Sequence, residues 1–163
     1  MGLQKAILEG KLAPSHCSKW KKARAAVRRR NIYYCGNDTS TQFFAASVAE
    51  ELLLNTELTE ESKDRAIHLL KEFGLYEYRD AHPSTLSGGQ KQRLAIACAV
   101  FSGRRILILD ESTSGLDGQN MRLIAERLKS EARNGRTILV ITHDRELIES
   151  CCDNIVEVEK RSS

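Results

Sequence analysis

An apolar run of strand length, Ile106-Leu107-Ile108-Leu109, ends directly in Asp110 and Glu111. A second apolar run, residues 137–141, follows after a helical pattern at about 119–133. Uninterrupted apolar runs are typical of strands that are buried on both faces, as in parallel sheets. A strand–helix–strand order also favours a parallel crossover, so we predict an α/β protein whose parallel sheet is covered by flanking helices.

The segments around these two strands extend the plan. Residues 32–35 and 155–158 have the composition of further strands, and a short helix is predicted from about Asp144 to Cys151. Ser47 and Thr59 stand where the N-caps of two more helices are expected. The chain is accordingly divided into a partial N-terminal core segment at 1–44, a helical subdomain at 45–85 and the remaining core at 86–163.

The segment Leu86-Ser87-Gly88-Gly89-Gln90 opens a further predicted helix. Ser87 and Gln90 have the spacing of a capping box, and the two glycines allow a ligand to approach the backbone closely. Unpaired amides at the start of a helix, together with the Ser87 hydroxyl, form a candidate anion site. Taken alone, the segment is explained equally well by a capped helix with a flexible lead-in.

Acidic and histidine side chains follow the buried strands. Ligands collect beyond the carboxyl ends of parallel strands, where Asp110 is a candidate ligand of Mg²⁺ and Glu111 a candidate base for a water molecule. His143 follows the next strand and is suited to stabilising phosphate charge. Asp117 belongs to Ser114-Gly115-Leu116-Asp117, which read alone is an ordinary turn and N-cap.

The order of these segments resembles the ABC ATPase family. Leu86–Gln90 is similar to the signature motif, 106–111 to Walker B with its catalytic glutamate, Ser114–Asp117 to the D-loop, and His143 to the switch histidine. Residues 33–54 resemble the Q-loop region of the energy-coupling-factor subunits, the cobalt and vitamin type. The resemblance implies a P-loop NTPase-type sheet, here incomplete, with an ABC helical subdomain.

The departures from the family pattern are also specific. No Gly-x-x-x-x-Gly-Lys-Ser/Thr occurs in the 163 residues, so the lysine and hydroxyl of a Walker A P-loop are missing. Asn37 stands where the family has the Q-loop glutamine. Ser112 stands where the family usually has a proline, and we expect this second replacement to matter little. We therefore expect a chain truncated before the P-loop, inactive alone, and prone to self-association or low stability.

The resemblance implies two subunits that enclose ATP and Mg²⁺ between them. It makes Glu111 and His143 catalytic and assigns metal contact to Asp110 and Asn37. It assigns nucleotide contact to Ser87, Gly88, Gly89, Gln90 and Asp117. The implied partners are a second ABC ATPase subunit, as a homo- or heterodimer, and a transmembrane permease that contacts the helical subdomain. The implied location is cytoplasmic, on the inner face of the cell membrane.

Two alternatives remain open. A non-catalytic module would lend its signature motif to the ATP site of another subunit. A DNA-associated ATPase of the structural-maintenance-of-chromosomes kind is suggested by residues 1–31, which hold nine Lys or Arg and one Glu. That class has a long coiled coil before the signature, whereas only 48 residues separate Asn37 from Leu86, which argues against nucleic acid as a partner. The five cysteines are read as reduced thiols.

Overall fold

The protein is described by a computed structural model that covers residues 3–8, 29–38, 42–113 and 116–158. Most of the basic N-terminal segment, including Cys17, lies outside these residues, as do Ser114 and Gly115 of the predicted D-loop. Within the described residues, no helix is both long enough and apolar enough to cross a membrane.

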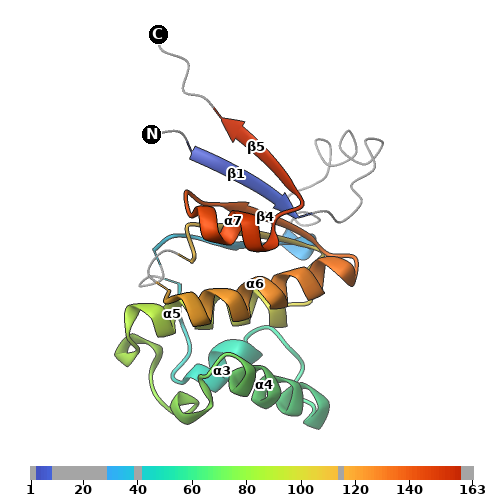
Figure 1. Cartoon of the computed structure of the whole chain (residues 1–163). Helices are drawn as coiled ribbons and strands as arrows, with labels where there is room; N and C mark the ends of the chain where they lie inside the picture. Colours follow the sequence, from blue (N-terminus) through green and yellow to red (C-terminus); the bar gives the residue numbers. More distant parts are fainter. Residues whose placement is uncertain (1–2, 9–28, 39–41, 114–115, 159–163) are drawn as a thin grey trace.

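Five strands form one sheet in the order β2-β3-β4-β1-β5. Strands β2, β3 and β4 are parallel neighbours, which confirms the predicted α/β class with a parallel sheet. Strand β1 was not predicted, and it runs antiparallel to both β4 and β5. β4 and β5 are consecutive along the chain but are not neighbours in the sheet, because β1 lies between them (Figure 1). The strands are β1 (Leu3–Leu8), β2 (Ile32–Cys35), β3 (Ile106–Asp110), β4 (Thr137–Ile141) and β5 (Asn154–Val158).

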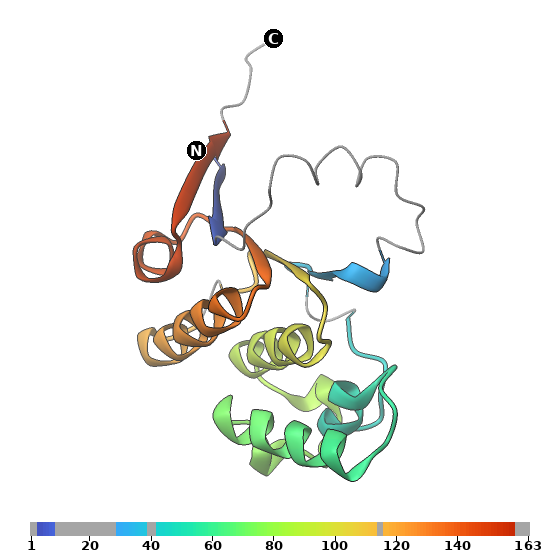
Figure 2. The ribbon, with the colours of Figure 1, turned by 90° about the vertical axis from the view of Figure 1, so that its right-hand side faces the viewer.

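The helices α5 and α6 lie against one side of the sheet, and α3 and α4 lie beyond α5 (Figure 2). Short 3-10 turns, η2 (Tyr76–Tyr78) and η3 (Pro83–Thr85), connect α4 to α5. The predicted helix boundaries agree with the structure to within one or two residues. The helices are α3 (Val48–Leu53), α4 (Glu60–Glu72), α5 (Gly88–Phe101), α6 (Gly118–Arg133) and α7 (Arg145–Cys151).

Side-chain burial in β3 and β4 alternates, which corrects the prediction that both faces of these strands are buried. Leu107, Leu109, Ile138 and Val140 are at most 1% exposed, whereas the residues between them are partly exposed. The alternation arises because the described helices lie on one side of the sheet only (Figure 2). The apolar run alone does not distinguish a strand covered on two faces from one covered on one face.

The helix caps form as the sequence predicts. Ser47 accepts a hydrogen bond from the amide of Glu50, and Thr59 forms a capping box with Ser62. Gly74 follows α4 with a φ of +63°, a left-handed conformation that glycine adopts without steric cost. These local signals fix the ends of the helices, and the apolar face of α4 then determines which side packs inward.

Helix α5 is buried on all sides in its second half. Every residue from Leu94 to Phe101 is buried. The cause is its place in the middle layer, where it contacts β2 and β3 on one side and α3 and α4 on the other. Small residues at Ala95, Ala97 and Ala99 are compatible with close packing in both directions.

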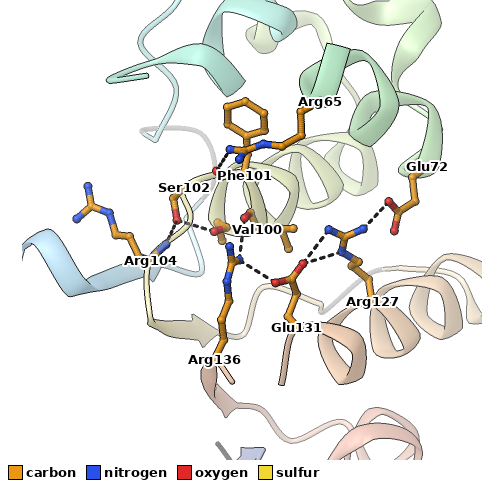
Figure 3. Close-up of polar contacts among 10 residues, drawn as sticks. Arg65, Glu72, Val100, Phe101, Ser102, Arg104, Arg127, Glu131 and Arg136 are labelled. Carbon is orange, nitrogen blue, oxygen red and sulfur yellow. Dashed lines mark hydrogen bonds and ion pairs between the residues drawn. The ribbon is translucent and has the colours of Figure 1, made fainter. Parts of the chain in front are cut away.

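An ion-pair network joins α4 to α6 and to the start of β4 (Figure 3). Arg127 lies 2.8 Å from Glu72 and 2.7 Å from Glu131, and Arg136 lies 3.0 Å from Glu131. Arg136 also donates to the carbonyl of Val100 at the end of α5. Glu131 is 6% exposed, so its carboxylate is compensated by two guanidinium groups inside the fold.

Candidate functional site

The predicted acidic and histidine residues gather at one edge of the sheet. β2 and β3 are parallel with Cys35 beside Leu109, so Asp110 ends β3 at the same edge of the sheet where Asn37 follows β2. Asp110 pairs with Ile141 of β4, two residues before His143. Parallel strands thus bring together residues that are far apart in sequence, as predicted for this edge.

Glu111 and His143 form an ion pair, with 2.9 Å between Oε2 of Glu111 and Nδ1 of His143. The hydrogen bond to Glu111 raises the pKa of His143 above its ordinary value, and the negative charge of Glu111 adds to the shift. The Glu111 side chain is 22% exposed and the His143 side chain 72% exposed. The pair therefore sits at the surface, with the carboxylate more enclosed than the imidazole.

The backbone of Glu111 has a φ of +52°, in the left-handed region that is uncommon for residues other than glycine. Its amide donates to the carbonyl of Ile141 at 2.8 Å, which continues the β3–β4 pairing by one residue. A left-handed residue directly after a strand turns the chain sharply. Strain of this kind is concentrated at functional sites, where the surrounding structure holds it.

Asp110 has a partner that the sequence analysis missed. The hydroxyl of Tyr34 donates to Oδ2 of Asp110 across 2.7 Å. This hydrogen bond is the main reason why the pKa of Tyr34 is raised above its ordinary value. One feature of the sequence could have indicated this contact. Side chains in a strand alternate between the two faces, so Tyr34 lies on the face of the sheet opposite to the buried Cys35.

Ser112 is buried, and its hydroxyl donates to the backbone carbonyl of Cys35 at 3.1 Å. The expectation that replacing proline by serine matters little overlooked this bond, because nothing in the sequence shows that the two segments are adjacent. The contact links the end of β2 to the segment after Glu111. Burial raises the pKa of the neighbouring Cys35 thiol, which lies 3.2 Å from the same hydroxyl.

The oxygen atoms at this edge fit Mg²⁺ only as a partial set of ligands. Asp110 offers a carboxylate, while Asn37 is exposed in the bend after β2 and makes no hydrogen bond to Asp110 in the described chain. Among the described residues, no group of three or more His, Cys, Asp or Glu side chains is arranged to hold a metal ion. Mg²⁺ is commonly held by one or two carboxylates together with waters and substrate phosphates, and these residues match that pattern.

The predicted anion-binding segment lies at the exposed start of α5. The amide of Ser87 donates to Oε1 of Gln90 at 2.8 Å, and the amide of Gln90 donates back to the Ser87 hydroxyl at 3.4 Å. A side chain placed at Gly88 would meet open space, and Gly89 is partly exposed. Ser87 and Gln90 satisfy each other, and the backbone beside them is open to an approaching molecule.

Asp117 is the N-cap of α6. Its carboxylate accepts hydrogen bonds from the backbone amide and the side-chain amide of Asn120, at 2.9 and 2.7 Å. These two bonds are the main reason why the pKa of Asp117 is lowered. Both carboxylate oxygens are thus used within the helix cap, which accords with the plain reading of this segment.

Two cavities in the described part of the chain lie away from these residues. One, of about 690 Å³, is lined by α4, the end of α5, and α6. The other, of about 210 Å³, lies between Tyr33, Phe44, Leu54 and Arg104. Neither of these two cavities is lined by a predicted site residue.

Comparison with known proteins gives consistent matches. The family model described as "ABC transporter" matches residues 6–114, more than half of the chain. The methionine import ATP-binding protein MetN of Escherichia coli K12 is 39% identical over 142 residues, which cover 86% of this chain and 41% of MetN. MetN of Haemophilus influenzae is 44% identical over 119 residues, 70% of this chain and 34% of that protein.

A solved structure described as the ATP binding subunit of an ABC transporter superimposes with a TM-score of 0.69 and 28% identity. The match covers 82% of this chain and 58% of that structure. The chain spans roughly a quarter to two fifths of the length of the curated relatives that it matches.

Proposed function

The chain belongs to the ABC transporter family, and on that premise we propose that it forms part of the ATP-binding subunit of an importer. The observation that carries the proposal is the Glu111–His143 pair beside Asp110, at the carboxyl edge of a parallel sheet. These are the positions at which the family resemblance implies phosphoryl chemistry. The matched relatives named as import proteins support the direction of transport.

Each group at the sheet edge has a proposed role. Glu111 orients or deprotonates the water that attacks the terminal phosphate, and His143 holds the Glu111 carboxylate while facing the developing phosphate charge. Asp110 and Asn37 would hold Mg²⁺, through water for at least part of its shell. When bound, Mg²⁺ would supply positive charge that offsets the charge of the phosphates.

The signature residues have a separate proposed role. Ser87, Gly88, Gly89 and Gln90 would contact ATP held mainly by a second ABC ATPase subunit, with Asp117 near the contact between the subunits. Their exposure at the start of α5 supports this proposal, since the backbone there is accessible from outside the chain. The amides at a helix start favour an anionic ligand such as a phosphate.

The cavity of about 210 Å³ beside Phe44 is the surface that we propose for a transmembrane permease. Phe44 is 83% exposed, and Leu54, which lines the same cavity, is 41% exposed. Glu51 is buried and accepts hydrogen bonds from the amides of Phe44 and Ala45, both at 2.8 Å, so it fixes the backbone that presents Phe44. Docking there would place the protein on the cytoplasmic face of the membrane.

The sequence resemblance and the matched relatives indicate different transported substrates. The resemblance of residues 33–54 to energy-coupling-factor subunits suggests a cobalt or vitamin importer, whereas the relatives reported above are named for methionine import. None of those relatives is named as an energy-coupling-factor subunit. We retain both substrate classes and propose an importer, because import is common to the two.

The non-catalytic alternative is favoured by one specific observation. The 163 residues contain no Walker A sequence, and phosphoryl transfer requires a cradle that positions the phosphates. We therefore propose that the 163-residue polypeptide does not hydrolyse ATP on its own. It would then act by offering its signature residues to the site of a partner.

One pair of assays tests these proposals. ATP hydrolysis is measured with the polypeptide alone and with added full-length MetN of Escherichia coli that keeps its own catalytic residues but carries an inactivating substitution in its own signature motif. We expect no turnover alone, and turnover in the mixture that is lost with Ser87→Arg but retained with Glu111→Gln if the chain acts only through its signature. Turnover by the polypeptide alone that disappears with Glu111→Gln would overturn the proposal and show a complete site in this chain.

A further inference from the structure

We infer that Tyr34 is a positioning residue for Asp110, and that it sets the affinity of this edge for a divalent cation. The inference rests on the proposed role of Asp110 in holding Mg²⁺. It concerns a residue outside the signature, Walker B, D-loop and switch-histidine motifs.

The sheet register brings the two side chains together. Tyr34 of β2 is paired with Ile108 of β3, so Asp110 is the next residue along β3 on the same face. Diagonal neighbours of this kind are within reach of a long aromatic side chain. The observed 2.7 Å from the phenol oxygen to Oδ2 is the distance of a strong hydrogen bond to a carboxylate.

Tyr34 differs from its neighbour Tyr33 in what its ring contributes. Tyr33 lies on the other face, packs against the buried core, and has Arg104 at 6.0 Å from its ring. Tyr34 is 57% exposed, so its ring adds comparatively little to the core. An exposed tyrosine whose hydroxyl binds a carboxylate at a candidate metal edge is better explained by that hydrogen bond than by packing.

The hydrogen bond restricts the Asp110 carboxylate in two ways. It occupies a lone pair of Oδ2, and it limits rotation of the carboxylate. The lone pairs that remain free to bind a cation therefore point in a narrower range of directions. The bond from Ser112 to Cys35 ties the same two strand ends on the other side of the sheet. Tyr34 and Asp110 are therefore held at a fixed separation before any cation arrives.

The two adjacent carboxylates consequently have different partners. Asp110 is held by a neutral phenol from β2, and Glu111 by an imidazole from beyond β4. A neutral donor orients a carboxylate without cancelling its charge, which suits a cation ligand. Hydrogen bonds of this kind to metal-binding carboxylates are typically worth 10- to 100-fold in metal affinity.

The test uses Mn²⁺ as the probe and the relaxation of water protons as the measure of binding to the 163-residue chain. Tyr34→Phe removes only the hydroxyl and is expected to weaken Mn²⁺ binding about 10-fold or more. Tyr78→Phe is the matched control, since Tyr78 is 41% exposed and lies in η2, remote from the sheet edge in sequence. Asp110→Asn defines the share of binding that belongs to this edge.

A spectroscopic measurement separates positioning from a general loss of structure. With ¹³C at the phenol carbon of tyrosine, the signal of Tyr34 should shift in Asp110→Asn and on addition of Mg²⁺, while that of Tyr78 stays in place. Thermal unfolding of Tyr34→Phe without metal should stay close to that of the native chain. A weakened Mn²⁺ affinity together with these results supports the inference.

Two results overturn it and are distinguishable. If Asp110→Asn abolishes Mn²⁺ binding and Tyr34→Phe leaves it unchanged, the positioning role is wrong while the proposed metal role of Asp110 stands. If Asp110→Asn leaves Mn²⁺ binding unchanged, the metal role of Asp110 is wrong, and the role of Tyr34 falls with it.

Discussion

His143 and Glu111 lie at the ends of neighbouring strands, and their ion pair depends on the β3–β4 register. Asp110 is paired with Ile141, and the amide of Glu111 donates a hydrogen bond to the carbonyl of Ile141. This pairing places the side chains of Glu111 and His143 next to each other. The ion pair is thus a consequence of strand pairing rather than of local sequence. The ion pair requires a protonated His143 and an ionised Glu111, so its strength depends on pH.

The first prediction concerns that pH dependence. The pKa of His143 is raised in the folded chain, so the pair stabilises the fold below the ordinary histidine pKa of 6.5 and the stabilisation is lost as pH rises through the raised value. Nuclear magnetic resonance titration of the His143 ring should give a pKa above 6.5, and Glu111→Gln should return it towards 6.5. An unchanged pKa in Glu111→Gln would show that the two groups are not paired in solution.

The second prediction concerns Glu131. Glu131→Gln leaves Arg127 and Arg136 without their shared carboxylate, and should lower the free energy of unfolding by about 2–3 kcal/mol. This is less than for a fully buried pair because the two arginine side chains are 30% and 20% exposed. The measurement is urea denaturation. Lys63→Ala is the control, since its ion pair with Glu60 is exposed to solvent and should contribute little to stability.

The third prediction compares two exposed glycines. Gly74 has a φ of +63°, and Gly74→Ala should destabilise the fold by about 1 kcal/mol or more, because a side chain is strained in the left-handed region. Gly118 begins α6 without positive φ, and a side chain there meets open space. Gly118→Ala should be neutral or slightly stabilising. Equal melting temperatures for the two variants would contradict the assigned backbone conformations.

The fourth prediction concerns the buried hydroxyl of Ser112. Ser112→Ala removes the hydrogen bond to the Cys35 carbonyl and should cost about 1 kcal/mol. Ser130→Ala, in the exposed part of α6, should change stability by less than about 0.5 kcal/mol. Amide hydrogen exchange should also become faster near Cys35 in Ser112→Ala. Unchanged exchange there would mean that the contact does not hold the end of β2.

The sequence predicts the strands β2 to β5, the helices and their caps because each depends on nearby residues. The Ser87–Gln90 capping box and the N-caps at Ser47 and Thr59 are examples, since each is encoded within a few positions. Contacts set by strand register were partly missed. Tyr34 reaches Asp110 across 76 positions and Ser112 reaches Cys35 across 77, and no local pattern marks either pair.

Strand β1 was missed for a related reason. Its residues, LQKAIL, have no regular alternation that distinguishes them from a loop, and β1 acquires its strand conformation by pairing with β4 and β5. The network around Glu131 was also absent from the prediction, because its members come from α4, α6 and the start of β4. Pairing and ion-pair partners of this kind are decided by tertiary structure.

The place of β1 between β4 and β5 has a consequence for the order in which the molecule assembles. Among the described residues, Leu3–Leu8 are synthesised before all others, yet the two segments that pair with them, Ile138–Ile141 and Asn154–Val158, are among the last described residues to be made. The helices around α5 can gather with β2 and β3 well before that point. Contacts between such distant parts of a chain form slowly, so closure of the sheet is expected to be the late step of folding during synthesis.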